Sequence, residues 1–162
     1  LAVAQARVLG INFLLSVLLL VWVADIFAYF AGRTFGGRFS KGKLAPSISP
    51  GKSWEGVWGG MAGVVVLSLA WVYVGNSAGG TGFWGGASLY GRLAANHGLL
   101  IMLLAVIFLA AMSVVGDLVE SLIKRSAGVK DSSGLLPGHG GVLDRVDALL
   151  PTLPLAMMLA TL

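Results

Sequence analysis

Long apolar runs separated by shorter polar stretches dominate this sequence. Four runs are apparent, at residues 8–30, 57–74, 99–119 and 142–162. A helix needs about 20 mainly apolar residues to cross the hydrocarbon core of a bilayer. The second run is near the short limit, and Pro151 and Pro154 interrupt the fourth, although proline is tolerated in transmembrane helices. The pattern predicts an all-α, polytopic membrane protein, a bundle of about four transmembrane helices.

Three stretches connect these runs, at residues 31–56, 75–98 and 120–141. Basic residues gather in the first and third of them: Arg33, Arg38, Lys41, Lys43 and Lys52, then Lys124, Arg125 and Lys130. The second stretch is rich in glycine and aromatic residues, and Arg92 is its only fixed charge, so we expect a flexible connection. The positive-inside rule places the two basic loops in the cytoplasm, and alternating spans agree. Arg7, just before the first run, weakly favours the opposite orientation.

The composition supports a membrane protein and excludes some chemistry. Of the 162 residues, 57% are hydrophobic and 11% are charged, and the mean hydropathy is +0.89. The chain has no cysteine, which excludes disulfides and thiolate metal sites. It begins with Leu1. We expect one integral-membrane domain, residues 1–162, from a longer chain.

Carboxylates within apolar runs are costly, so each is a candidate for function. Asp25 and Asp117 lie near the ends of their runs, next to the basic loops. Asp144 and Asp147 have i, i+3 spacing, so they share one face if their segment is helical. These aspartates either pair with neighbouring Lys and Arg or form a site for a hard cation. Oxygen ligands suit Mg²⁺, which binds through carboxylates together with substrate phosphates.

The segment SISPGKSWEG, residues 47–56, contains a short phosphate-binding signal. Gly51, Lys52 and Ser53 match the end of a P-loop, but Pro46 stands where that motif needs a glycine. No strand-like run precedes it. The segment therefore argues against a P-loop NTPase, although Lys52 can still contact phosphate.

The polar stretch that runs from the third loop into the start of the fourth run mixes charges in a way that suits a metal and a phosphate together. Lys124, Arg125, Lys130 and Arg145 interleave with Asp131, Asp144 and Asp147. His139 lies among glycines that let backbone amides approach an anion closely. It could be a metal ligand, an acid or base, a phosphate donor, or none of these.

The run SLIKRSAGVKDSSGLLPGHGGVLDRVD, residues 121–147, resembles the signature of the phosphatidate cytidylyltransferases, or CDP-diacylglycerol synthases. DIFAYFAGRTFG at residues 25–36 and SPGKSWEG at residues 49–56 fit the same family. The resemblance covers about residues 21–154. Because members of that family usually carry several spans ahead of this region, the chain resembles their C-terminal catalytic part.

The resemblance implies that CTP and phosphatidate give CDP-diacylglycerol and pyrophosphate, with Mg²⁺ and, as a second cation, K⁺. The partners would be CTP, phosphatidate and membrane lipid, with no nucleic acid. The implied location is a bacterial inner membrane with the site facing the cytoplasm. Phosphatidate is largely dianionic near neutral pH, so it can attack the α-phosphorus of CTP without a general base. Catalysis then consists mainly of positioning and charge neutralisation.

The candidate site residues fall into three groups. The metal group is Asp25, Asp117, Asp144 and Asp147. The group closing the site from the first loop, for substrate binding, is Ser49, Lys52 and Ser53. The catalytic group is Lys124, Arg125, Lys130, Asp131, His139 and Arg145. Its lysines and arginines would hold phosphates, and the role of His139 stays open.

Other functions remain as alternatives. A CTP-dependent polyprenol or lipid kinase would transfer the γ-phosphoryl group instead. A transporter would need polar groups through the membrane depth, and the outer halves of these runs carry almost none. An inactive membrane fragment that supports a partner is a third alternative. Gly59, Gly60 and Gly63 predict close helix packing, either within the chain or in a homodimer.

Overall fold

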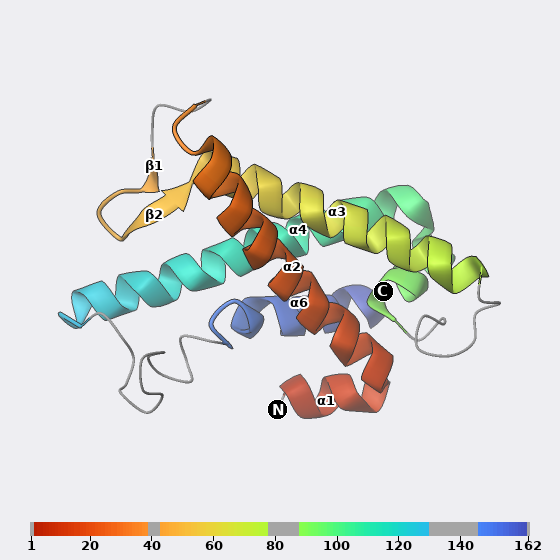
Figure 1. Cartoon of the computed structure of the whole chain (residues 1–162). Coiled ribbons are helices and arrows are strands. Elements are labelled where there is room, and N and C mark those ends of the chain that lie inside the picture. The colour runs from red at the N-terminus through yellow and green to blue at the C-terminus, as the bar shows by residue number, and fades with distance from the viewer. Residues whose placement is uncertain (1, 39–42, 78–87, 130–145, 162) are drawn as a thin grey trace.

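The computed structural model describes residues 2–38, 43–77, 88–129 and 146–161 (Figure 1). Its elements in chain order are the helices α1 (Ala2–Leu9) and α2 (Ile11–Phe35), the strands β1 (Lys43–Ala45) and β2 (Ser49–Ser53), and the helices α3 (Trp54–Ser77), α4 (Leu89–Ser126) and α6 (Leu149–Thr161). Helices α2, α3 and α4 pack together, and α6 lies against α2 and α4.

Among the described residues, three helices are long and apolar enough to cross a membrane, which confirms the predicted polytopic helical fold. They are α2, α3 over Trp54–Gly75, and α4. The mean hydropathies of their apolar segments are 2.3, 1.8 and 2.9, respectively. The fourth predicted span appears as α6, whose 13 residues extend only about 20 Å at 1.5 Å per residue. Residues 142–145, where that span was expected to begin, lie outside the described part of the chain.

The described parts of the first two connections contain regular structure that the sequence pattern did not predict. In the first, β1 and β2 form an antiparallel hairpin that leads directly into α3. In the second, α4 already begins at Leu89, where Ser88 caps it by accepting a hydrogen bond from the Gly91 amide at 3.1 Å. The expectation of a flexible connection at residues 75–98 was therefore wrong from Leu89 onward. Gly98 itself adopts a positive φ of 83° and breaks the helix there.

Glycines bring α2 and α3 into close contact. A Cβ atom on Gly60 would lie 2.8 Å from the Ala24 carbonyl oxygen, and one on Gly56 would lie 2.9 Å from the Ala28 carbonyl oxygen. A Cβ atom on Gly63 would overlap the Phe27 side chain. The predicted close packing is thus found within the chain, where α3 lies almost directly on the backbone of α2.

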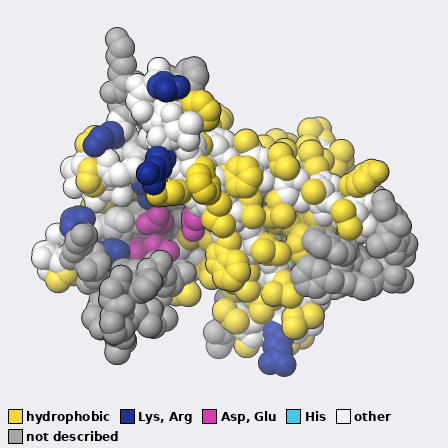
Figure 2. Space-filling model, in the orientation of Figure 1, with side chains coloured by type: hydrophobic (Ala, Val, Ile, Leu, Met, Phe, Trp, Pro, Cys, Tyr) yellow, Lys and Arg dark blue, Asp and Glu magenta, His cyan; other side chains and the backbone are white. Residues whose placement is uncertain are grey.

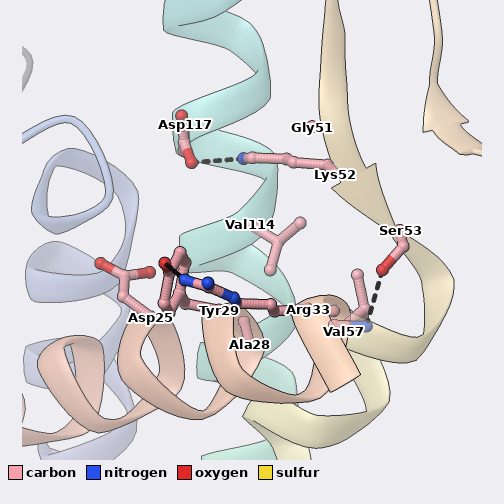
Figure 3. A pocket seen from close by; sticks show the side chains of 12 residues that line it. Asp25, Ala28, Tyr29, Arg33, Gly51, Lys52, Ser53, Val57, Val114 and Asp117 are labelled. Carbon is pink, nitrogen blue, oxygen red and sulfur yellow. Dashed lines mark hydrogen bonds and ion pairs between the residues drawn. The ribbon is translucent and has the colours of Figure 1, made fainter. Parts of the chain in front are cut away.

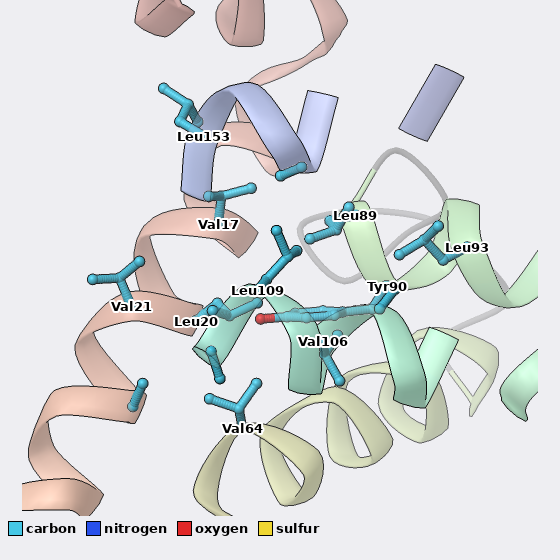
Figure 4. Close-up of a cluster of buried hydrophobic side chains, with 14 of the residues drawn as sticks. Val17, Leu20, Val21, Val64, Leu89, Tyr90, Leu93, Val106, Leu109 and Leu153 are labelled. Carbon is cyan, nitrogen blue, oxygen red and sulfur yellow. The ribbon is translucent and has the colours of Figure 1, made fainter. Parts of the chain in front are cut away.

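Buried hydrogen bonds hold the opposite end of the bundle. The Ser16 hydroxyl accepts from the Leu89 amide at 3.0 Å, and the Tyr90 hydroxyl donates to the Ser16 carbonyl at 2.9 Å. The Tyr90 ring packs edge-on against Trp71. Around it, apolar side chains of α2, α3, α4 and α6, with Ala6 of α1, form the core (Figure 4). The start of α4 is thereby fixed to the second turn of α2.

Charge is concentrated at one end of the molecule. Most of the described Lys and Arg residues lie at the end formed by the hairpin and the last turns of α2 and α4: Arg33, Arg38, Lys43, Lys52, Lys124 and Arg125. Arg7 and Arg92 lie at the other end, where Arg92 donates to the Leu9 carbonyl at 2.8 Å. Figure 2 shows acidic side chains in a hollow at the basic end, beside a broad apolar surface. We call this the charged end.

The glycine contact predicts an unusual effect of alanine. At an open helical site, alanine in place of glycine stabilises by about 1 kcal/mol, but Gly60→Ala forces α2 and α3 apart. We expect it to lower the free energy of unfolding by about 1–3 kcal/mol, measured as a lower thermal midpoint in detergent. Gly51→Ala is the matched control, because nothing lies within 4 Å of its added Cβ. An unchanged or raised midpoint for Gly60→Ala would contradict the close contact.

Candidate functional site

A cavity of about 440 Å³ opens at the charged end (Figure 3). Its polar lining comes from three parts of the chain: Asp25, Tyr29 and Arg33 on α2, Lys52 and Ser53 on β2, and Asp117 on α4. Gly32, Gly51 and Gly56 leave its walls open, and Val57 and Val114 provide apolar surface. Residues far apart in the sequence therefore meet in one concave site, the arrangement expected of a ligand site.

The junction of β2 and α3 positions Lys52 and Ser53. The Ser53 hydroxyl accepts a hydrogen bond from the Gly56 amide at 3.2 Å and so caps α3. The preceding residue, Lys52, extends across the cavity and forms an ion pair with Asp117 (Figure 3). Strand β2 contains the glycine, lysine and serine itself, so no phosphate loop separates strand from helix. The exclusion of a P-loop agrees with this geometry.

Three carboxylates form a compact group beside the cavity. Asp117, Glu120 and Asp147 each offer an oxygen within 4.8 Å of the other two. Asp117 and Glu120 are neighbours on one face of α4, and Asp147 lies in the turn before α6. Carboxylate oxygens from two segments suit a hard divalent cation such as Mg²⁺. We call these three residues the carboxylate cluster.

The close approach of α6 to α4 places Asp147 in this cluster. A Cβ atom on Gly116 would lie 2.7 Å from the Pro151 ring and 2.9 Å from the Asp147 carbonyl oxygen. Only glycine at this position lets the turn before α6 lie so near α4. The Asp147 carboxylate in turn accepts from the Ala148 amide at 2.7 Å, which orients it.

Electrostatics within the group favour a bound cation. Burial raises the pKa of the Asp147 carboxyl above its usual range. The nearby charges of Asp117 and Asp25 act in the same direction, whereas hydrogen bonds with Glu120 and the Ala148 amide oppose them. Carboxylates that share a partly buried site resist joint ionisation. A divalent cation would remove that penalty.

The end of α4 supplies two further cations. The Lys124 ammonium lies 3.2 Å from the Glu120 carboxylate, one turn away. The Arg125 guanidinium donates to the Ile48 carbonyl at 3.4 Å, which links α4 to the turn of the hairpin. Gly128, with a φ of 71°, ends the helix here. In this structure both side chains contact the protein itself.

The structure brings together part of the predicted site. Asp25, Asp117, Lys52 and Ser53 line one cavity, and Asp147 joins Asp117 through the carboxylate cluster. Ser49 begins β2 and is not among the residues that line the cavity. Five predicted site residues lie outside the described part of the chain: Lys130, Asp131, His139, Asp144 and Arg145.

Sequence reasoning missed several residues at this end. Glu120 was assigned to the third loop, but α4 continues to Ser126, so Glu120 is a buried carboxylate one turn after Asp117. Their i, i+3 spacing was the available signal. Arg33 and Tyr29 were not singled out, and the structure places both on the cavity wall.

Together, the fold and the cavity define a polytopic membrane protein with a candidate cation site at one end of its helices. The model of the family described as "Cytidylyltransferase family" matches residues 1–162. The chain therefore belongs to the cytidylyltransferase family.

Curated relatives agree with this assignment. The chain is 45% identical over 145 residues to the phosphatidate cytidylyltransferase of Haemophilus influenzae, an alignment that covers 90% of this chain and 44% of the relative. The protein of the same name from Pseudomonas aeruginosa is 47% identical over 141 residues, covering 87% and 44%. That of Bacillus subtilis is 37% identical over 153 residues, covering 94% and 49%. The chain thus spans about half the length of these relatives.

The contact at Gly116 predicts how the carboxylate cluster can be disturbed without removing a ligand. Gly116→Ala pushes the turn before α6 away from α4, so Asp147 moves relative to Asp117. We expect Mn²⁺, as a probe for Mg²⁺, to bind about tenfold or more weakly, measured by electron paramagnetic resonance of free Mn²⁺. Val115→Ala on the same helix, where the side chain is exposed, is the control. Equal Mn²⁺ affinity in both variants would contradict the placement.

Proposed function

We propose that this chain carries the catalytic site that transfers the cytidylyl group of CTP to phosphatidate, giving CDP-diacylglycerol and pyrophosphate. The observation that carries the proposal is the carboxylate cluster beside a cavity lined by Lys52 and Arg33. The reaction brings a phosphate dianion to a triphosphate, so it needs a metal site and fixed cations close together. The relatives share the name phosphatidate cytidylyltransferase, which supports the same reaction.

Asp117, Glu120 and Asp147 would hold Mg²⁺, and Asp25 and Asp144 would complete or support its surroundings. When bound, Mg²⁺ neutralises phosphate oxygens and orients them for in-line displacement. Lys52 is held close to Asp117 by their ion pair, within reach of a phosphate bound beside the metal. Val57 and Val114 limit water at the inner wall of the cavity.

The cations of α4 and of the following loop would position the remaining phosphates. Lys124 and Arg125 lie in the last turn of α4, where they contact Glu120 and the Ile48 carbonyl of the hairpin turn. We assign Lys130 and Arg145, with Asp131 and His139, to the same segment of the site by their place in the sequence. Ser53 contributes chiefly by fixing the start of α3. K⁺ is a candidate for a second cation.

The reaction would take place at the cytoplasmic face of a bacterial inner membrane. The concentration of Lys and Arg at the charged end supports this orientation, because cytoplasmic loops carry an excess of basic residues. At this depth CTP arrives from water and the phosphate of phosphatidate lies in the interface. Neither the proposal nor the described residues require a nucleic acid or a second copy of the chain.

A product assay tests the reaction. The chain, purified in detergent, is incubated with CTP, phosphatidate and Mg²⁺. We expect radiolabel from the α-phosphate of CTP to enter lipid, with release of pyrophosphate. Release of CDP, with the γ-phosphate in lipid, would instead identify a lipid kinase. Failure to label lipid from either position would contradict the proposal for this chain.

Removing one carboxylate tests the assigned metal ligands. We expect Asp147→Asn to lower turnover by more than about a hundredfold, because metal stabilisation of transition-state charge is worth several kcal/mol and each 1.36 kcal/mol is tenfold. The thermal midpoint should change little. The matched control is Glu55→Gln, which removes a carboxylate in the first turn of α3, and we expect it to retain turnover. Near-normal turnover in Asp147→Asn would refute the assignment.

A further inference from the structure

Two side chains of α2 lie where the cavity meets the outer surface of the helix. Tyr29 and Arg33 line the cavity together with Asp25, and they are also on the side of α2 that faces outward. Tyr29 is 58% exposed. They are one helical turn apart, at i and i+4.

An exposed apolar face of α2 leads to this pair. Trp22 and Ile26 are 58% and 51% exposed, and with Tyr29 and Arg33 they follow the i, i+4, i+7, i+11 pattern of a single face. In a bilayer such a face contacts lipid chains. From Trp22 to Arg33 the helix rises about 16 Å at 1.5 Å per residue. That is about half of the roughly 30 Å hydrocarbon core, or one leaflet.

A hydrogen bond fixes the cation at the end of this face. The Arg33 Nη1 atom donates to the Tyr29 hydroxyl oxygen at 2.8 Å (Figure 3). A guanidinium carries five N–H donors, so this bond leaves others for a second acceptor. Arginine binds phosphate in a bidentate manner, and an already oriented fork loses less entropy when it does so. Lys52, the other cation lining the described cavity, is engaged by Asp117 on the α4 side.

We propose that Arg33 binds the phosphate of the lipid substrate, with the acyl chains lying along the face formed by Trp22, Ile26 and Tyr29. Tyr29 is the positioning residue for the guanidinium. The proposal rests on the proposed function and assigns the two substrates to different sides of the cavity. The α2 side receives the phosphomonoester of the lipid, whereas the side formed by Lys52 and the carboxylate cluster receives the triphosphate. A lipid held at Arg33 keeps its headgroup in the cavity while its chains remain in the bilayer.

Steady-state kinetics in mixed micelles distinguish an effect on phosphatidate binding from an effect on CTP binding. In Arg33→Gln we expect the KM for phosphatidate to rise about tenfold or more, while the KM for CTP stays within about twofold. Arg33→Lys should recover part of the loss, because it keeps the charge but not the fork. Tyr29→Phe should raise the KM for phosphatidate about threefold and leave kcat unchanged, which a purely structural role would not produce. Arg38→Gln, an exposed arginine outside the cavity lining, is the matched control.

Binding without turnover distinguishes this proposal from the proposed function. Dioctanoyl phosphatidate and CTP are titrated separately into the purified chain by calorimetry. Weaker phosphatidate binding by Arg33→Gln, with CTP binding retained, supports the lipid assignment even if the chain makes no CDP-diacylglycerol. If only the affinity or KM for CTP changes, or if Arg33→Gln behaves like Arg38→Gln in an active chain, the assignment is overturned. A wild-type chain that binds no phosphatidate overturns both proposals.

Discussion

The close contact between α2 and α3 is the constraint on which the charged end depends. Gly56 and Gly60 let α3 approach the carbonyl groups of α2 at distances that a side chain would prevent. This approach brings the end of β2, with Lys52, onto the face of α2 that carries Asp25 and Arg33. Helix α4 then closes the cavity with Asp117. A wider spacing of α2 and α3 would leave the same side chains too far apart to share a ligand.

A second glycine contact extends the same principle to the carboxylate cluster. Gly116 lets the turn before α6 approach α4, so that carboxylates from two segments meet. Apolar helices in a bilayer gain little from the hydrophobic effect when they associate, because lipid chains are equally apolar. Close backbone packing is therefore an effective way for this chain to hold four carboxyl groups, those of Asp25, Asp117, Glu120 and Asp147, near one another. An ion pair with Lys52 and a contact with Lys124 offset part of their repulsion.

The sequence predicted three of its four spans as long apolar helices, because the bilayer imposes a minimum apolar length on every helix that crosses it, whereas the fourth appears as the shorter α6. It also pointed to Asp25, Asp117 and Asp147, since a carboxylate in an apolar run is costly. It did not predict the hairpin, because Ser49, Pro50 and Gly51 have little β propensity and their pairing depends on neighbours. Glu120 was missed because hydropathy falls before α4 ends. The role of Gly116 depends on a partner in α6 and has no local signal. The roles assigned to residues 130–145 stay predictions.

The buried hydrogen bonds among Ser16, Leu89 and Tyr90 have a mechanical consequence for the bundle. They fix α4 to α2 at the end opposite the cavity, whereas the cavity end is held by an ion pair and by the exposed bond from Arg125 to Ile48. Exposed polar contacts open at lower free energy than buried ones. We therefore expect the polar contacts of α4 at the cavity end to open at lower free energy than those that Ser16, Leu89 and Tyr90 make at the opposite end.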